Sequence, residues 1–153
     1  MVTVIVWIVV AAVRNRDSLA FVTEQVLDQA EERWQQHGPA SYDLDVASTG
    51  ARKAEIHVEV RKGVVTAMTI DGHTPSQRRT WDVWSVPGQF DMIWDDLENA
   101  KHPEQAFGVR DSSQVTLRGE FDEHYGYPKQ YERITNGGVG EVRWRVVQFE
   151  AVE

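Results

Sequence analysis

Residues 56–70 read IHVEVRKGVVTAMTI, and this stretch decides the fold class. Its first part, residues 56–60, alternates apolar with polar side chains, which is typical of a strand with one buried face. Lys62 and Gly63 predict a tight turn, and residues 64–70 predict a strand that returns along the first. The stretch therefore predicts an antiparallel hairpin within a half-buried sheet.

Further strands are predicted on both sides of this hairpin. The same alternation appears in residues 42–46, 115–121, 130–134 and 142–152. Residues 122–128 connect two of these strands, and the glycine-rich residues 136–140 connect the next two. Residues 81–84 fit an additional short strand. Most of the sheet is thus expected to consist of consecutive strands that neighbour one another.

Two segments instead show apolar residues every three or four positions, as one face of a helix requires. The first spans residues 18–37, where Asp17 or Ser18 can cap the start and Gly38 ends the helix. Its predicted apolar positions are Leu19, Val22, Val26, Ala30 and Trp34. Nothing between residues 13 and 19 breaks a helix, so this helix could continue the segment that precedes it.

The second helix is predicted to begin after Ser85, which can cap it, with Pro87 in its first turn. Its apolar face is expected to carry Phe90, Ile93, Trp94 and Leu97. We expect Ile93 and Trp94 to pack against the sheet through Val58, Val60 and Leu117. The predicted far face carries Asp91, Asp95, Asp96 and Glu98.

The order of these elements predicts an α+β fold with one antiparallel sheet. The sheet is expected to consist of two consecutive helix-plus-meander units, with the helices packed on one face. Trp34, Trp94 and Trp144 are predicted to belong to the core because they share the apolar positions of their elements.

An apolar segment precedes this domain. Residues 2–13, VTVIVWIVVAAV, carry no charge and show neither helical nor strand periodicity. As a helix, residues 1–13 would reach about 20 Å, short of the roughly 30 Å hydrocarbon core of a bilayer. We expect residues 1–16 to form a membrane anchor or signal segment, with residues 1–13 in contact with the membrane, and residues 17–153 to form a single domain. A buried core strand is the alternative.

The composition excludes several classes of function. The chain has 153 residues and a formal net charge of −8, so it lacks the basic surface that nucleic-acid binding requires. It contains no cysteine, which excludes disulfides, thiolate nucleophiles and cysteine-ligated zinc. No phosphate-binding loop, dinucleotide fingerprint or hydrolase elbow is present, so no cofactor is predicted.

Three motifs together resemble the DUF6174 family, a bacterial domain of unknown function. They are VEVRKGVV over residues 58–65, SVPGQFDMI over 85–93 and FDEHYGYP over 121–128. The resemblance extends over residues 34–152. The sequence departs from the family at Glu123, where a proline is common, and it lacks the cysteine pair of some members.

The resemblance implies a location in the cell envelope and no known chemistry. Family members are largely exported or lipid-anchored, so we expect the domain on the outer side of the cell membrane. Arg14 and Arg16 follow the apolar segment and favour the opposite orientation by the positive-inside rule.

One candidate for metal chemistry is the segment Asp122, Glu123 and His124. Adjacent residues on an extended segment point in different directions, whereas a metal needs convergent ligands. We therefore interpret residues 122–128 as a structural hairpin loop and predict no metal site. We expect this loop to have a structural role only, with Gly126 at a positive φ and Pro128 at the start of a strand. The residues assigned to this role are Asp122, Tyr125, Gly126, Tyr127 and Pro128.

The other titratable groups receive structural interpretations as well. Asp91, Asp95 and Asp96 are expected on a solvated helix face rather than in an acid/base site. The histidines at positions 37, 57, 73, 102 and 124 show no metal-ligand spacing. His57 lies between Glu55 and Glu59 on a polar strand face, where the three could form a surface cluster.

Trp81 and Trp84 form the one predicted binding surface. They cannot both face inward if residues 81–84 form a strand, so one of them can anchor a ligand. Partial burial under a loop is the alternative. We expect a non-catalytic, membrane-tethered domain that binds a protein or small ligand across its sheet or the edge at residues 81–87. The alternative is a hydrolase or metal-dependent enzyme that uses His57, His124 and nearby carboxylates.

Overall fold

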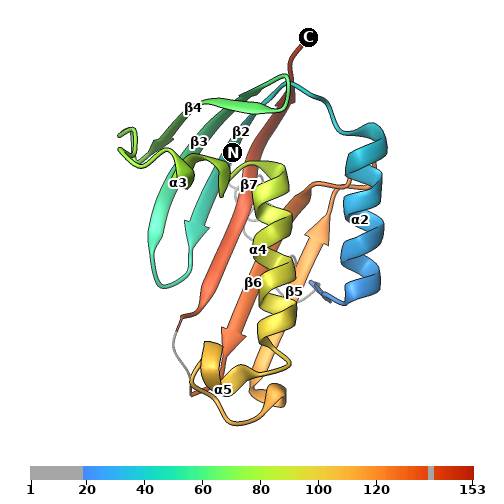
Figure 1. Cartoon of the computed structure of the whole chain (residues 1–153), viewed down its shortest axis with the longest axis vertical. Coiled ribbons are helices and arrows are strands. Elements are labelled where there is room, and N and C mark those ends of the chain that lie inside the picture. Colours follow the sequence, from blue (N-terminus) through green and yellow to red (C-terminus); the bar gives the residue numbers. More distant parts are fainter. Residues whose placement is uncertain (1–18, 138–139) are drawn as a thin grey trace, which may run out of the picture.

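The computed structural model describes residues 19–137 and 140–153. The chain forms an α+β domain with one seven-stranded antiparallel sheet, which confirms the predicted class (Figure 1). The predicted anchor, residues 1–16, lies outside the described residues. None of the helices in the described part of the chain is long and apolar enough to cross a membrane.

The sheet has the strand order β1-β5-β6-β7-β2-β3-β4. Its strands are β1 (Ala20–Phe21), β2 (Tyr42–Thr49), β3 (Lys53–Arg61), β4 (Val64–Ile70), β5 (Val115–Phe121), β6 (Pro128–Thr135) and β7 (Val142–Ala151). Two meanders, β2-β3-β4 and β5-β6-β7, therefore lie side by side, and the last strand of the second pairs with the first strand of the first. The helices are α2 (Glu24–His37), α3 (Arg79–Asp82), α4 (Val86–Asn99) and α5 (Pro103–Ala106), with a 3-10 turn at Ser112–Gln114.

The hairpin of β3 and β4 turns at Lys62 and Gly63, as predicted. Both residues have positive φ, 51° and 78°, which is the conformation of the two-residue turns that match the twist of a sheet. The side chains of Ile56, Val58 and Val60 are buried, and the residues between them are more exposed. The alternation in the sequence thus correctly predicts which face of the hairpin is buried.

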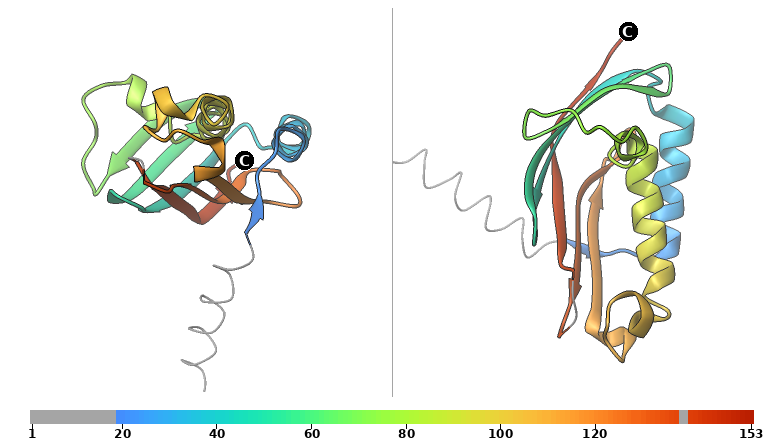
Figure 2. Two further views of the ribbon diagram at one scale, coloured as in Figure 1. Left: turned by 90° about the horizontal axis from the view of Figure 1, so that it is seen from below. Right: turned by 60° about the vertical axis from the view of Figure 1, so that its left-hand side comes forward.

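The two long helices, α2 and α4, lie on the same side of the sheet, and among the described elements no helix lies on the other side (Figure 2). Trp94 of α4 donates a hydrogen bond from its indole Nε1 to Glu31 Oε2 of α2, over 2.7 Å. At the other end of α4, the amide of Val86 donates to the hydroxyl of Tyr42 over 2.9 Å. Burial raises the pKa of this hydroxyl to about 12.

The core lies between the helices and the covered face of the sheet. Its largest fully buried side chains are Trp144, Tyr42, Tyr131, Phe90, Leu27, Leu44, Met68 and Ile93. The prediction of a core position is confirmed for Trp144, whereas Trp34 and Trp94 are only partly buried against the core. Ile93 is fully buried, and Trp94 fills the space between α2 and α4.

The predicted start of the first helix is wrong. Residues 20–21 form β1 against β5, and the amide of Val22 donates to the carbonyl of Leu117 over 3.0 Å. Hydrogen bonding to the sheet therefore keeps residues 20–22 extended, and the helix begins at Glu24 with Thr23 as its cap. A continuous helix from residue 13 to residue 37 is excluded by this strand. Within α2, Leu27 rather than Val26 is buried.

Residues 81–84 do not form the predicted strand. Arg79–Asp82 form the short helix α3, and Val83 keeps helical dihedral angles. The segment lies beside the edge strand β4, where Arg78 donates to the carbonyl of Val65 over 2.6 Å, and it leads directly into α4 through the bond from the amide of Ser85 to the carbonyl of Asp82 (3.2 Å). Ser85 caps α4 as predicted, and its Oγ accepts from the amide of Gly88 over 3.2 Å.

Candidate functional site

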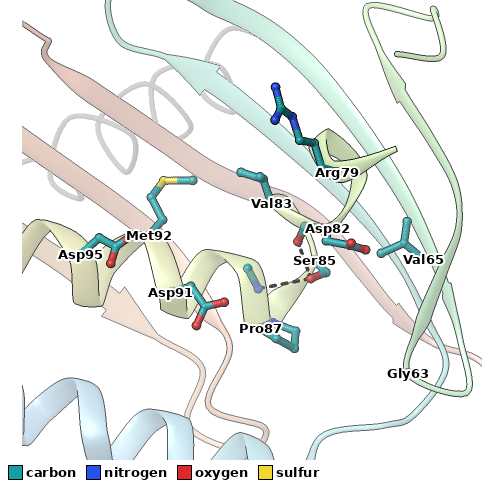
Figure 3. A pocket seen from close by; sticks show the side chains of 11 residues that line it. Gly63, Val65, Arg79, Asp82, Val83, Ser85, Pro87, Asp91, Met92 and Asp95 are labelled. Atoms are coloured by element: carbon teal, nitrogen blue, oxygen red, sulfur yellow. Dashed lines mark hydrogen bonds between the residues drawn. The ribbon is translucent and has the colours of Figure 1, made fainter. Parts of the chain in front are cut away.

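A groove of about 500 Å³ lies where α3 and the start of α4 approach β4 and the turn at Gly63 (Figure 3). Its apolar lining comes from Val65, Val83, Pro87 and Met92. Val83 is 42% exposed and presents apolar surface to the groove. The groove therefore offers apolar surface to a ligand without rearrangement of the core.

One wall of this groove is acidic. Asp82, Asp91 and Asp95 line it, and within the described residues none of the three takes part in an ion pair. Asp91 and Asp95 are one helical turn apart, where like charges repel and destabilise a helix. The only cation in the lining is Arg79, whose Nε donates to Gln77 Oε1 over 3.3 Å. This wall suits a positively charged group.

A second hollow of about 330 Å³ continues the groove toward α2. It shares Gly63, Ser85 and Pro87 with the first and is lined further along by Trp34 and Phe90. The two hollows together run from α3, past the start of α4, to the C-terminal half of α2. This length suits a segment of chain better than a compact metabolite.

The predicted binding residues Trp81 and Trp84 lie beside the groove and do not line it. The indole of Trp81 donates to the carbonyl of Pro75 over 3.0 Å, and the guanidinium of Arg78 lies 4.1 Å from its ring centre. Trp84 packs edge-on against the buried Trp144, with ring centres 6.2 Å apart. Both rings are half-buried, and both hold α3 in place beside the groove.

The loop at residues 122–128 is organised by its own backbone. The carboxylate of Asp122 accepts hydrogen bonds from the amides of His124 (3.0 Å) and Tyr125 (2.6 Å). Its amide bonds the carbonyl of Tyr127, which closes the loop. Pro128 then begins β6 and is buried.

The same loop contacts α2 closely. Gly126 has a φ of 89°, and a Cβ there would come within 2.2 Å of the carbonyl oxygen of Ala30. Tyr127 stacks on Phe149 with ring centres 4.3 Å apart. The loop thus joins the second meander to α2, while its lack of a chemical role stays a prediction.

His57 lies on the sheet face opposite α2 and α4. Its Nδ1 is 2.6 Å from Asp45 Oδ1, and its Nε2 is 3.4 Å from Glu59 Oε1. The hydrogen bond to Asp45 raises the pKa of the imidazole above its ordinary value of 6.5, and Glu59 adds to this effect. The predicted surface cluster forms with Asp45 and Glu59, while Glu55 has no contact with His57 among the described residues.

The groups of the predicted enzyme alternative lie apart. His124 is on the helix side of the sheet, where its ring stacks on His37 with centres 6.5 Å apart. Among the described residues, no hydrogen bond or ion pair joins His57 to Asp122, Glu123 or His124. Nor does the described part of the chain contain three histidine or acidic side chains placed to hold one metal ion.

Asp96 was expected on the solvated face of α4, and this prediction is wrong. The carboxylate is 4% exposed and pairs with Arg133 Nη1 of β6 over 2.5 Å. The hydroxyl of Tyr131 donates to its other oxygen over 2.7 Å. Burial raises the pKa of Asp96, although both partners oppose this change. The sequence carries a signal for this site, since Arg133 occupies an inward position of its strand, two residues after Tyr131.

Comparison with known proteins places the chain in one family. No curated protein and no solved structure matches it. The model of a family of unknown function, DUF6174, matches residues 26–132, which is more than half of the chain. The matched region begins in α2 and ends within β6, and it includes both the groove and the loop at residues 122–128. The chain belongs to the DUF6174 family.

Proposed function

We propose that this protein is a non-catalytic binding domain of the cell envelope, held at the membrane by residues 1–16 with the domain on the outer side. Its architecture is two helix-plus-meander units that share one sheet, with both long helices packed on one face. In this proposal the apolar leader supplies the tether and the folded domain supplies the binding surface.

The groove beside α3 and α4 carries the binding proposal. It combines apolar side chains with three aspartates that have no ion-pair partner among the described residues. Such a surface lowers the stability of the isolated domain through exposed apolar area and through repulsion between Asp91 and Asp95. A bound partner with apolar and cationic groups relieves both effects. We therefore assign the ligand as a protein segment or small molecule of that character.

The separation of the titratable groups also supports binding over catalysis. General acid/base chemistry requires groups that converge in one pocket. His57 and His124 lie on opposite faces of the sheet, and each has structural partners: Asp45 and Glu59 for His57, His37 and Tyr125 for His124.

Affinity capture with matched charge variants tests the groove. The full chain is captured from native membranes as wild type, as Asp91→Lys/Asp95→Lys, and as the control Asp28→Lys/Glu32→Lys. The control changes two acidic residues with the same spacing on the exposed face of α2. We expect the groove variant to lose partners that the control retains. Identical partners in all three samples would contradict the proposal.

Fractionation tests the tether separately. We expect the full chain in the membrane fraction and a chain that begins at Ser18 in the soluble fraction, because only the former contains the apolar residues 2–13. The shorter chain retains β1, so it keeps every described strand. A full chain that stays folded and soluble in detergent-free buffer would contradict the tether and leave the groove proposal intact.

A further inference from the structure

The sheet face opposite α2 and α4 contains a hollow of about 540 Å³. It lies over strands β2, β3 and β7 and reaches the end of β4. Polar and charged side chains line it together with apolar ones. Among the polar and charged ones are Glu55, His57, Thr69, Arg145 and Gln148.

Strand register places opposite charges on either side of a small residue in this hollow. Ala47 of β2 pairs with Glu55 of β3 on one side and with Arg145 of β7 on the other. Directly opposed residues share a face of the sheet, so all three project into the same hollow. Neighbouring strands are about 4.8 Å apart, which puts the Cα atoms of Glu55 and Arg145 about 10 Å apart. The methyl group of Ala47 leaves the space between them open.

Neither charge takes part in an ion pair within the described residues, whereas several other charges on the same face do. Arg143 pairs with Glu141 over 2.7 Å, and Arg61 pairs with Asp43 over 2.7 Å. Glu55 and Arg145 are thus an anion and a cation that line the same hollow without an ion-pair partner among the described residues.

The adjacent cross-strand row supplies further hydrogen-bonding groups. Gln148, Asp45, His57 and Thr69 follow one another across β7, β2, β3 and β4. The carboxylate of Asp45 is engaged by His57, so this row adds little uncompensated charge. The amide of Gln148 and the hydroxyl of Thr69 are available at the two ends of the row.

We propose that this hollow binds a small zwitterion, an α- or β-amino acid, with its carboxylate on Arg145 and its ammonium group on Glu55. Charge-assisted hydrogen bonds from the guanidinium to the carboxylate and from the ammonium group to Glu55 would hold such a molecule at both ends. The site is on the opposite face from the groove and is independent of the function proposed above.

NMR titration of the full chain, labelled with 15N and held in detergent, tests this inference. The probes are glycine and β-alanine, with acetate and methylamine as ligands that carry only one of the two charges. We expect saturable shifts of the Ala47 and Thr69 amides with both zwitterions, and at least tenfold weaker binding of the single-charge probes. Arg145→Gln and Glu55→Gln are each expected to weaken glycine binding at least tenfold.

Two variants serve as matched controls. Glu150→Gln removes a carboxylate from the same face outside the hollow, and Arg52→Gln removes a cation from the β2–β3 turn. Both are expected to bind glycine like the wild type. The inference is overturned if glycine produces no saturable shift. A direct ion pair between Arg145 and Glu55 in solution would give that result, because it would leave neither charge free for glycine. The inference is also overturned if acetate reproduces the glycine shifts, or if the controls weaken binding as much as the hollow variants.

Discussion

Gly126 is the residue through which the loop at residues 122–128 reaches α2. Gly126→Ala combines a positive φ with a Cβ placed 2.2 Å from the carbonyl of Ala30, so it should lower the free energy of unfolding by about 2 kcal/mol or more. Gly137→Ala is the control, because its φ is 83° but its Cβ would meet no atom closer than 3.9 Å. Chemical denaturation of both variants measures the difference. Equal losses would show that the contact with α2 contributes nothing.

Asp96 is the buried charge that fixes α4 on the second meander. Asp96→Ala leaves Arg133 without its carboxylate and Tyr131 without its acceptor, so it should cost about 3 to 5 kcal/mol of unfolding free energy. Asp95→Ala, on the exposed side of the same helix turn, should change stability by less than about 0.5 kcal/mol. Similar midpoints for the two variants in urea would refute the buried pair.

These two residues show what can be predicted from the sequence at this scale. The positive φ of Gly126 could be predicted because its neighbours are turn residues. The backbone conformation of a turn depends mainly on residues close in the sequence. Asp96 was misplaced because a hydropathy pattern assigns charged residues to the solvent side. The buried positions of α4 are Val86, Gln89, Phe90, Ile93 and Asp96, which follow helical spacing regardless of polarity. Only the partner on a distant strand explains the burial of that carboxylate.

At the scale of elements, α2 and α4 are joined by Trp94. Its ring is half-buried between the helices and its Nε1 bonds Glu31, so Trp94→Ala should cost about 2 to 3 kcal/mol, below the range of about 3 to 5 for a fully buried ring. Trp94→Phe retains most of the packing and should cost about 1 kcal/mol for the lost hydrogen bond. Denaturant midpoints of the two variants measure these costs. If Trp94→Ala lost no more stability than Trp94→Phe, the packing of Trp94 between α2 and α4 would be contradicted.

Strands β2 and β3 are linked by a pH-dependent contact on the open face. The pKa of His57 is raised in the folded state by Asp45 and Glu59, so protonated His57 contributes stability that is complete below its ordinary value of 6.5. This contribution is lost as the pH rises through the folded-state pKa. The difference in unfolding free energy between wild type and His57→Gln should therefore shrink with increasing pH. A difference that is constant or grows would contradict the Asp45–His57 contact.

Element order was predictable, but two short elements were not. The alternation in residues 42–46 and 56–60 is long enough to give both the strand and its buried face. The strand at Ala20–Phe21 has only two residues, too few for any period, and it forms because β5 offers hydrogen-bonding partners. Residues 81–84 were misread because two aromatic residues and a valine fit a strand as well as they fit α3.

At the scale of the whole molecule, the sheet separates two surfaces of different character. The helix side carries the acidic and apolar groove, and the open side carries the polar hollow at Ala47. The location of the groove could not be predicted, since Val65, Val83 and Met92 come from three elements that only the fold brings together. The sequence predicted a binding surface at the neighbouring Trp81 and Trp84. These two side chains lie beside the groove and pack against the rest of the domain.

Site-specific photo-cross-linking in native membranes tests the central claim most directly. A photoreactive residue replaces Met92 in the groove or, as a control, Gln29 on the exposed face of α2. The account predicts a reproducible cross-linked species from position 92 that is lost in the Asp91→Lys/Asp95→Lys background and absent from position 29. No cross-linked species from position 92, or the same species from both positions, would contradict a binding groove between β4 and α4.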